Sequence, residues 1–117
     1  MTTPNGQSIT LAHPTEHNMD TRTEILTILQ EEAAEVIQII SKIHRFGFNT
    51  DAYSPDGVFT TNARRLEQEL GDLQCMIDLC IEHQLVDETR IQIHSQDKRQ
   101  KLKTWSKIPH GLLLQME

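Results

Sequence analysis

The sequence predicts an all-α fold, a helical bundle with an aliphatic core. Hydrophobic residues make up 37% of the 117 residues and aromatic residues only 4%, so Ile and Leu must form most of the core. In three long segments the apolar residues recur every three or four positions, the spacing that keeps them on one face of a helix. Five glycines and few alternating β-branched runs give little signal for a sheet.

The first predicted helix runs from about Thr23 to Arg45. Asp20 or Thr21 is suited to cap its start, and Gly47 is a common residue just beyond the end of a helix. The following segment, GFNTDAYSPDGVFTT (residues 47–61), contains Ser-Pro and Asp-Gly, which favour turns. It is therefore predicted to be a loop.

Two more helices are predicted after this loop, from about residue 61 to 83 and from about 87 to 105. Together the three helices form one predicted domain, residues 21–107. Residues 1–20 are polar and without periodicity, which predicts a mobile N-terminal arm. The C-terminal tail, residues 108–117, contains Pro109 and Gly111, so at most a short helical segment is expected there.

Charge and cysteine content limit the function classes. A net charge of −6 argues against a nucleic-acid partner, because phosphate backbones are met by basic surfaces. No apolar run is long enough to span a membrane, so no membrane partner is expected. Cys75 and Cys80 lie five positions apart in a predicted helix, where they cannot bridge each other. Free thiols suggest a reducing, cytoplasmic location.

Glu32 lies in the middle of the apolar face of the first helix. At about 100° of turn per residue, five aliphatic side chains fall within or close to about 40° of its direction: Ile25, Leu29, Val36, Ile39 and Ile43. An unpaired carboxylate facing a core is expensive. Either this helix is less buried than its pattern suggests, or its surroundings favour negative charge.

The second helix repeats the pattern with Glu69, which is surrounded by Leu66, Leu73, Met76, Ile77 and Cys80. Each helix also carries a second acid three residues later, Glu35 or Asp72, about 60° to one side. Residues at this spacing share one helix surface. If the two apolar faces pack together, four carboxylates converge; otherwise they form solvated acidic faces.

Four converging carboxylates repel one another unless a cation lies between them. Oxygen ligands of this kind suit Mg²⁺, for which Mn²⁺ can substitute. The sequence offers no His three residues after a Glu, as di-iron bundles use, and no Cys and His spacing suited to structural zinc. Glu31 either belongs to the rim of the predicted site or makes ordinary contacts on the helix surface.

Basic and polar residues supply candidates for binding a polyphosphate beside the metal. Lys98 and Lys101 share a predicted face with Trp105, although a solvated face is the alternative. Lys42 and Arg45 lie near the end of the first helix, where cations also interact favourably with the helix dipole. The remaining candidate is Asn62, which either binds a ligand or caps the second helix.

These motifs resemble a known enzyme family. EEAAE (31–35) followed by ELGD (69–72) resembles the paired ExxE and ExxD motifs of MazG-like all-α nucleoside triphosphate pyrophosphohydrolases. The resemblance extends to EVIQ (35–38), SKIHRFG (41–47), TN (61–62) and KRQKLKTW (98–105). The longer pattern is most similar to the short, single-domain members common in phage genomes, and it covers about residues 24–106.

The resemblance implies hydrolysis of a nucleoside triphosphate between its α and β phosphates. Glu32, Glu35, Glu69 and Asp72 would bind Mg²⁺, Glu35 or Glu31 would assist the attacking water, and lysines would hold the distal phosphates. Family members form homo-dimers or tetramers, which agrees with the further apolar residues Leu26, Ile37 and Ile40. A purine substrate, dGTP or GTP, is expected first. The alternatives are a pyrimidine-specific dUTPase or dCTPase of the same fold, and a non-catalytic helical interaction protein.

Overall fold

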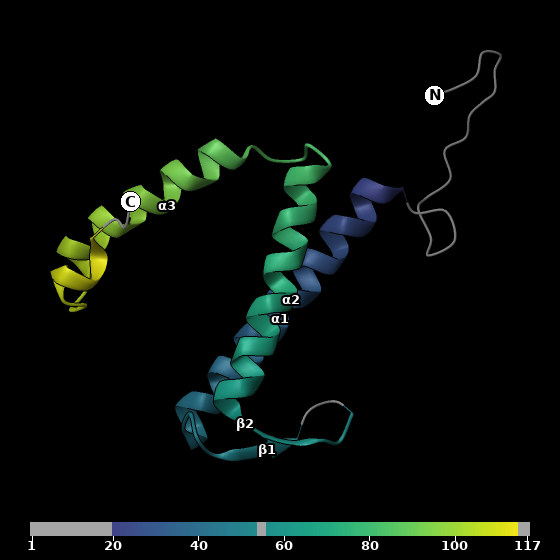
Figure 1. Cartoon of the computed structure of the whole chain (residues 1–117), viewed down its shortest axis with the longest axis vertical. Coiled ribbons are helices and arrows are strands. Elements are labelled where there is room, and N and C mark those ends of the chain that lie inside the picture. Colours follow the sequence, from purple (N-terminus) through teal and green to yellow (C-terminus); the bar gives the residue numbers. More distant parts are fainter. Residues whose placement is uncertain (1–19, 54–55, 115–117) are drawn as a thin grey trace. The chain divides into compact units, whose positions relative to one another are not determined.

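The computed structural model describes residues 20–53 and 56–114 (Figure 1). These residues form three α-helices, one pair of short strands and one 3₁₀ helix, in the order α1, β1, β2, α2, α3, η1. The predominantly helical character is the one that the sequence predicts. The predicted N-terminal arm other than Asp20, the Ser-Pro pair of the predicted loop (54–55) and the last three residues lie outside the described residues.

The chain divides into two compact units, Met1–Ile77 and Asp78–Glu117. The first contains α1, the strand pair and most of α2. The second contains the end of α2, then α3 and η1.

Helix α1 spans Thr21–Phe46, two residues earlier and one later than predicted. It starts early because Asp20 is its N-cap: the Asp20 carboxylate accepts a hydrogen bond from the Thr23 backbone N–H at 2.7 Å. This bond also lowers the pKa of Asp20. At the other end Gly47 adopts a φ of +97°, which favours glycine, and its N–H donates to the Ile43 carbonyl at 2.7 Å. Gly47 therefore ends the helix as predicted.

The predicted loop contains a small hairpin. Strands β1 (Asp51–Tyr53) and β2 (Phe59–Thr61) pair antiparallel, with Asp51 opposite Thr61. Its turn includes Asp56, whose carboxylate accepts from the Val58 N–H at 3.1 Å, and Gly57 at a φ of +86°. Strands of three residues are too short to show an alternating pattern, so the sequence signals only the Asp-Gly turn.

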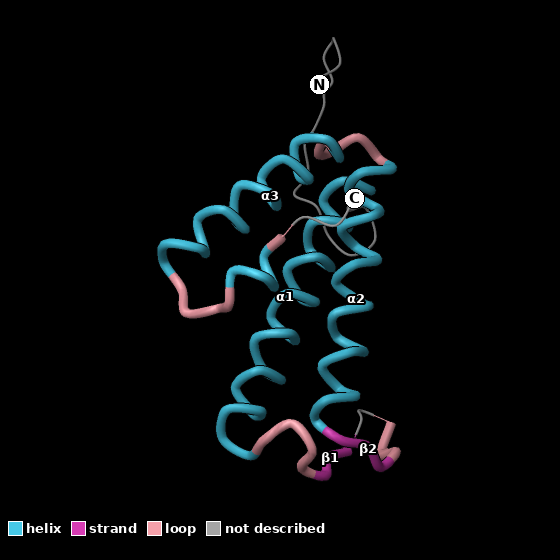
Figure 2. The backbone as a smooth tube through the Cα atoms, turned by 60° about the vertical axis from the view of Figure 1, so that its left-hand side comes forward, coloured by secondary structure: helices cyan, strands magenta, loops and turns pink. Residues whose placement is uncertain are grey.

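Helix α2 spans Asn62–Glu82, and its part up to Ile77 lies antiparallel beside α1 (Figures 1 and 2). The predicted apolar stripes face inward, because Ile25, Ile39 and Met76 are buried. The remaining aliphatic members of these stripes in the first unit are half-buried: Leu29, Val36, Ile43, Leu66, Leu73 and Ile77. The strand pair joins the two helices at one end of this first unit.

The second unit begins with the end of α2, where the chain turns through Gln84 at a φ of +61°. The Gln84 and Leu85 N–H groups donate to the Ile81 and Cys80 carbonyls, the pattern of a Schellman motif. Cys75 and Cys80 are both free thiols, as predicted, and Cys80 is buried whereas Cys75 is exposed. A helix turns Cys75 about 140° away from Cys80, toward the polar side.

Helix α3 spans Glu88–Trp105, and the 3₁₀ helix η1 (His110–Leu113) folds back against it. The Asp87 carboxylate caps α3 by accepting from the Arg90 N–H at 2.9 Å. Leu113 is buried, and the Arg99 guanidinium donates to the Leu112 carbonyl at 3.4 Å. Across residues 20–53 and 56–114, no helix combines the length and the apolar character needed to cross a bilayer.

Candidate metal centre

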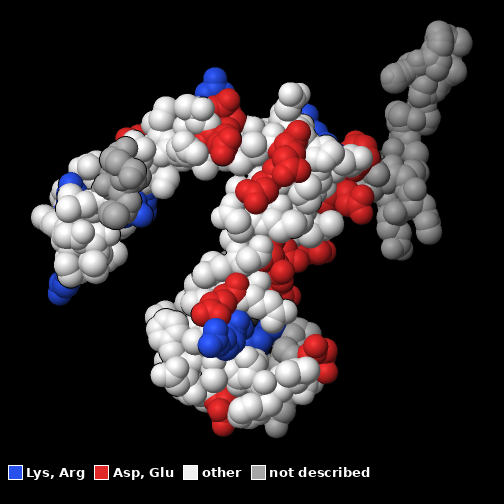
Figure 3. Space-filling view, in the orientation of Figure 1, with Lys and Arg blue, Asp and Glu red and all other residues white. Residues whose placement is uncertain are grey.

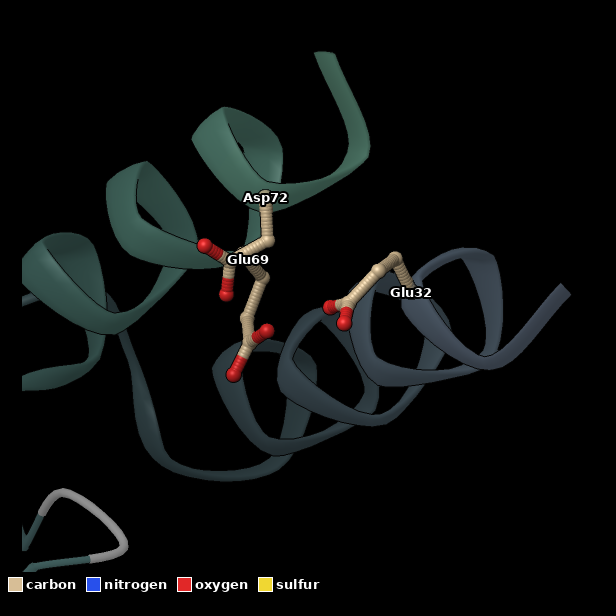
Figure 4. A group of neighbouring side chains, drawn as sticks. All are labelled: Glu32, Glu69 and Asp72. Carbon is tan, nitrogen blue, oxygen red and sulfur yellow. The ribbon is translucent and has the colours of Figure 1, made fainter. Parts of the chain in front are cut away.

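Three of the four predicted carboxylates come together between α1 and α2. Figure 4 shows Glu32 extending from α1 toward Glu69 and Asp72 of α2. One carboxylate oxygen from each of the three lies within 4.8 Å of the others. These three residues are called the acid cluster below. They meet because each helix places an acid within the apolar stripe that packs against the other helix.

The acid cluster is closed on one side and open on the other. Glu69 is buried, with 4% of its surface exposed, whereas Glu32 is half-buried and Asp72 is exposed. Acidic side chains are also visible along the paired helices in Figure 3. A ligand can therefore approach the cluster from the side of Asp72.

Crowding raises the pKa of Glu32 above its ordinary value. Partial loss of hydration is the largest cause, because it disfavours the charged carboxylate. The negative charges of Asp72, Glu69, Glu35 and Glu31 add to this effect, in that order. The cluster thus favours either a proton or a metal cation at Glu32.

Arg65 is part of this site, and the sequence analysis did not single it out. Its guanidinium Nη2 lies 2.8 Å from Glu69 Oε2, and its Nη1 donates to Gln68 Oε1 at 3.3 Å. Both partners of the ion pair are well buried, with 12% of the Arg65 side chain and 6% of the Glu69 side chain exposed. Four residues before Glu69, Arg65 lies about 40° from it on the same helix face. The helical periodicity that places Glu69 on the apolar stripe therefore places Arg65 on the same stripe.

The acid cluster has the donor set that Mg²⁺ prefers. Two oxygens bound to one Mg²⁺ at about 2.1 Å lie at most about 4.2 Å apart. The observed spread of up to 4.8 Å needs only small side-chain adjustments. With all groups ionised, three carboxylates and the Arg65 guanidinium carry a formal charge of −2, which one divalent cation balances. Glu32, Glu69 and Asp72 thus fit such an ion.

Glu35 and Glu31 lie beside the cluster rather than in it. Both are exposed on α1, and neither belongs to the group of three carboxylates. They are nevertheless near enough for their charges to raise the pKa of Glu32. The structure thus places Glu35 and Glu31 at the rim of the acid cluster.

The other predicted site residues of the first unit occupy the hairpin end of the helix pair. Asn62 is buried, and its Nδ2 donates to the Gly47 carbonyl at 3.1 Å. Lys42 is exposed on α1. The exposed Arg45 donates to Ser41 Oγ at 3.2 Å, and its guanidinium lies 5.4 Å from the Phe46 ring centroid.

The remaining predicted substrate-binding residues belong to the second unit. Lys98, Lys101 and Trp105 are all exposed on α3, and Trp105 has 81% of its surface exposed. None of the three packs in a core of this unit. The exposed ring of Trp105 is accessible to a ligand or to a partner chain.

The chain was also compared with known proteins: no family model matches it, and no curated protein or solved structure does so either.

Proposed function

We propose that this protein is a Mg²⁺-dependent nucleoside triphosphate pyrophosphohydrolase. It would cleave between the α and β phosphates and release a nucleoside monophosphate and pyrophosphate. The reaction is inferred from the resemblance of the motifs to those of MazG-like enzymes. The acid cluster is the structural observation that supports the proposal most strongly.

That observation is the meeting of acids from two helices where the apolar faces pack. Glu32 and Glu69 lie 37 positions apart in the sequence, and each occupies an otherwise aliphatic stripe. Acids that serve only solubility gain nothing from half-buried or buried positions, where charge is costly. Convergence within 4.8 Å, with one open side, supports a role in holding a cation.

The residues around the cluster have separate roles in this proposal. Glu32, Glu69 and Asp72 would hold the cation, joined by Glu35 if its side chain turns inward. A bound divalent cation would neutralise phosphate charge and supply a water of lowered pKa. Glu35, or alternatively Glu31, would accept a proton from the attacking water, since both are exposed beside Glu32.

Binding of the substrate would use basic side chains and a second subunit. Lys42, Arg45, Lys98 and Lys101 would contact phosphates, Asn62 would line the site, and Trp105 would contact the base. A homo-dimer or tetramer would assemble a larger helical bundle through apolar side chains that are exposed in the single chain. A purine substrate, dGTP or GTP, is proposed ahead of dUTP or dCTP from the phage-type motif pattern.

One observation favours a different class of function, a non-catalytic helical interaction protein. The 2.8 Å pair with Arg65 already satisfies a Glu69 oxygen, so part of the cluster is neutralised without a metal. Exposed apolar side chains such as Ile37 would then serve a protein partner. This alternative predicts that divalent cations leave the melting temperature of the protein unchanged. It also predicts that the protein hydrolyses no nucleotide in their presence.

Product analysis with all common NTPs and dNTPs tests the proposed function. Each nucleotide is incubated with Mg²⁺, with Mn²⁺ or with EDTA, and the products are separated by ion-exchange chromatography. The proposal predicts monophosphate and pyrophosphate in the metal-containing samples, with dGTP or GTP consumed fastest. The absence of any product from every nucleotide would contradict it.

Substitutions in the acid cluster test which residues hold the cation. Glu32→Gln and Asp72→Asn should each lower kcat by about 100-fold or more, because metal catalysis contributes several kcal/mol and each 1.4 kcal/mol is about tenfold in rate. Glu67→Gln is the matched control, since Glu67 is an exposed acid on α2 that pairs with Arg64. Wild-type rates in either cluster variant would remove that residue from the site.

A further inference from the structure

Arg65 is a charged side chain in a place where charge is expensive. It lies in the first turn of α2, where the helix dipole disfavours cations, and only 12% of its side chain is exposed. A buried ion pair offsets the loss of hydration only when its geometry is good. The neighbouring Arg64 shows the ordinary alternative, an exposed pair with Glu67 at 3.1 Å.

The contacts of Arg65 fix its guanidinium beside the acid cluster. Nη2 contacts Glu69 at 2.8 Å and Nη1 contacts Gln68 at 3.3 Å. A guanidinium carries five N–H donors in a planar fork, and these two contacts use two of them. Further donors therefore remain for an oxyanion that approaches the cluster.

We propose that Arg65 is a phosphate-binding residue of this site. Resting on the proposed function, the inference assigns Arg65 to the phosphate chain of the nucleotide. A guanidinium matches phosphate oxygens in a bidentate manner and stays charged at all working pH values. Already held by Glu69 and Gln68, it would lose little conformational freedom on binding. Arg65 thus supplies a fixed positive charge one hydrogen bond away from a predicted metal ligand.

Isothermal titration calorimetry of wild-type protein and the Arg65→Gln variant tests this role without turnover. Mn²⁺ alone is titrated first, and then pyrophosphate is titrated in the presence of Mg²⁺. Arg65→Gln should bind Mn²⁺ at least as tightly as wild type, because a positive charge near the cluster has been removed. Its affinity for pyrophosphate should fall about tenfold, a factor that corresponds to about 1.4 kcal/mol.

Arg64→Gln is the matched control, with the same chemical change one residue earlier in an exposed pair. It should bind both probes like wild type. If Arg65→Gln also binds pyrophosphate like wild type, Arg65 is only a counter-ion of Glu69 and the inference is wrong. If Arg65→Gln folds by circular dichroism but loses Mn²⁺ binding, Arg65 acts through Glu69, and the inference is wrong in that case too.

Arg65→Lys decides the question if Arg65→Gln does not fold. Lysine keeps a positive charge beside Glu69 but lacks the planar fork. Weaker pyrophosphate binding with unchanged Mn²⁺ binding supports the inference, and wild-type binding of both contradicts it. Failure of the proposed function would give a different result from failure of this inference. Wild-type protein would then cleave no nucleotide but would still bind pyrophosphate through Arg65.

Discussion

Glu32 determines how the acid cluster responds to protons and cations. Its carboxylate is half-buried on α1 and faces Glu69 and Asp72 across the helix pair (Figure 4). The resulting rise in its pKa means that the folded chain holds a proton at Glu32 more tightly than the unfolded chain does. Ionised Glu32 therefore opposes folding unless a cation compensates its charge.

Replacing Glu32 by Gln should raise the melting temperature of the metal-free protein at pH 7. Gln resembles the protonated side chain and removes repulsion from Asp72 and Glu69. If the acid cluster binds Mg²⁺ as proposed, the cation should stabilise the folded wild-type protein but should have little effect on the variant. Thermal unfolding followed by circular dichroism, with Glu67→Gln as the control, measures both. A destabilised Glu32→Gln protein without metal would contradict this account of the residue.

The same reasoning gives the pH dependence of stability without metal. An acid with a raised pKa in the folded state contributes stability below that pKa, and the contribution disappears as the pH rises through it. The free energy of unfolding of wild-type protein relative to Glu32→Gln should therefore fall as the pH rises above 4.5, the ordinary pKa of a glutamate. Saturating Mg²⁺ should reduce this fall, because a cation favours the ionised carboxylate. Parallel melting curves of the two proteins across this range would contradict the prediction.

At the scale of single residues, the apolar stripes predict the acid cluster, but they do not predict that Arg65 is its counter-ion. Glu32 and Glu69 were identified because charged residues stand out among Ile and Leu. Arg65 lies on the same stripe, but a long basic side chain usually reaches solvent, so its position alone does not predict burial. Only the structure shows that it turns toward Glu69.

At the scale of elements, hydrogen bonds of Asn62 hold the start of α2 to the segment that follows α1. Its Nδ2 donates to the Gly47 carbonyl, and its backbone N–H donates to the Thr50 carbonyl at 3.1 Å. The neighbouring Ala63 N–H donates to the Phe48 carbonyl at 2.8 Å. The start of α2 is thus tied to the residues that follow α1, which sets how Glu69 approaches Glu32.

Asn62→Ala should lower the free energy of unfolding by about 1–3 kcal/mol, because it removes the side-chain donor that serves the Gly47 carbonyl. Urea unfolding measures this change, and Asn49→Ala is the control because Asn49 is exposed in the same connection. If Asn62 instead serves mainly as a substrate ligand, KM would rise while the free energy of unfolding stayed at the wild-type value. That result would contradict the structural role.

Helix positions were largely predictable and the connecting segment was not. The start and end of α1 and the start of α3 follow from the capping residues Asp20, Gly47 and Asp87, whose effects are local. The strand pair depends on backbone pairing between residues six to ten positions apart, such as Asp51 and Thr61. Such pairing leaves no periodic signal in so short a segment.

At the scale of the whole molecule, the assembly of the chain is the open question, and several aliphatic side chains of the first unit are exposed. Ile37 has 68% of its surface exposed, Leu70 47%, Leu26 43% and Ile40 40%, all on α1 or α2. Leu26, Ile37 and Ile40 are the apolar residues that the sequence places on α1 beyond the stripe that faces the acid cluster. Exposed aliphatic side chains of this kind can be covered by a second copy of the chain, which supports the proposed homo-dimer or tetramer.

If Ile37 lies in the contact of the proposed oligomer, Ile37→Glu should convert that oligomer to monomers, because a glutamate buried in an apolar contact lacks a partner. Size-exclusion chromatography with light scattering measures the mass of the 13.5 kDa chain and its assemblies. Gln92→Glu, an equal charge change at an exposed polar position of α3, should leave the assembly unchanged. An Ile37→Glu protein with the wild-type oligomeric mass would place the contact elsewhere.

The central claim, that the acid cluster supports cleavage between the α and β phosphates, is tested most directly by ³¹P NMR of one reaction. Wild-type protein is mixed with dGTP and Mg²⁺, spectra are recorded through the reaction, and EDTA is added before completion. The account predicts that monophosphate and pyrophosphate signals grow together and stop when EDTA is added. Diphosphate and inorganic phosphate, or products that continue to form in EDTA, would contradict it.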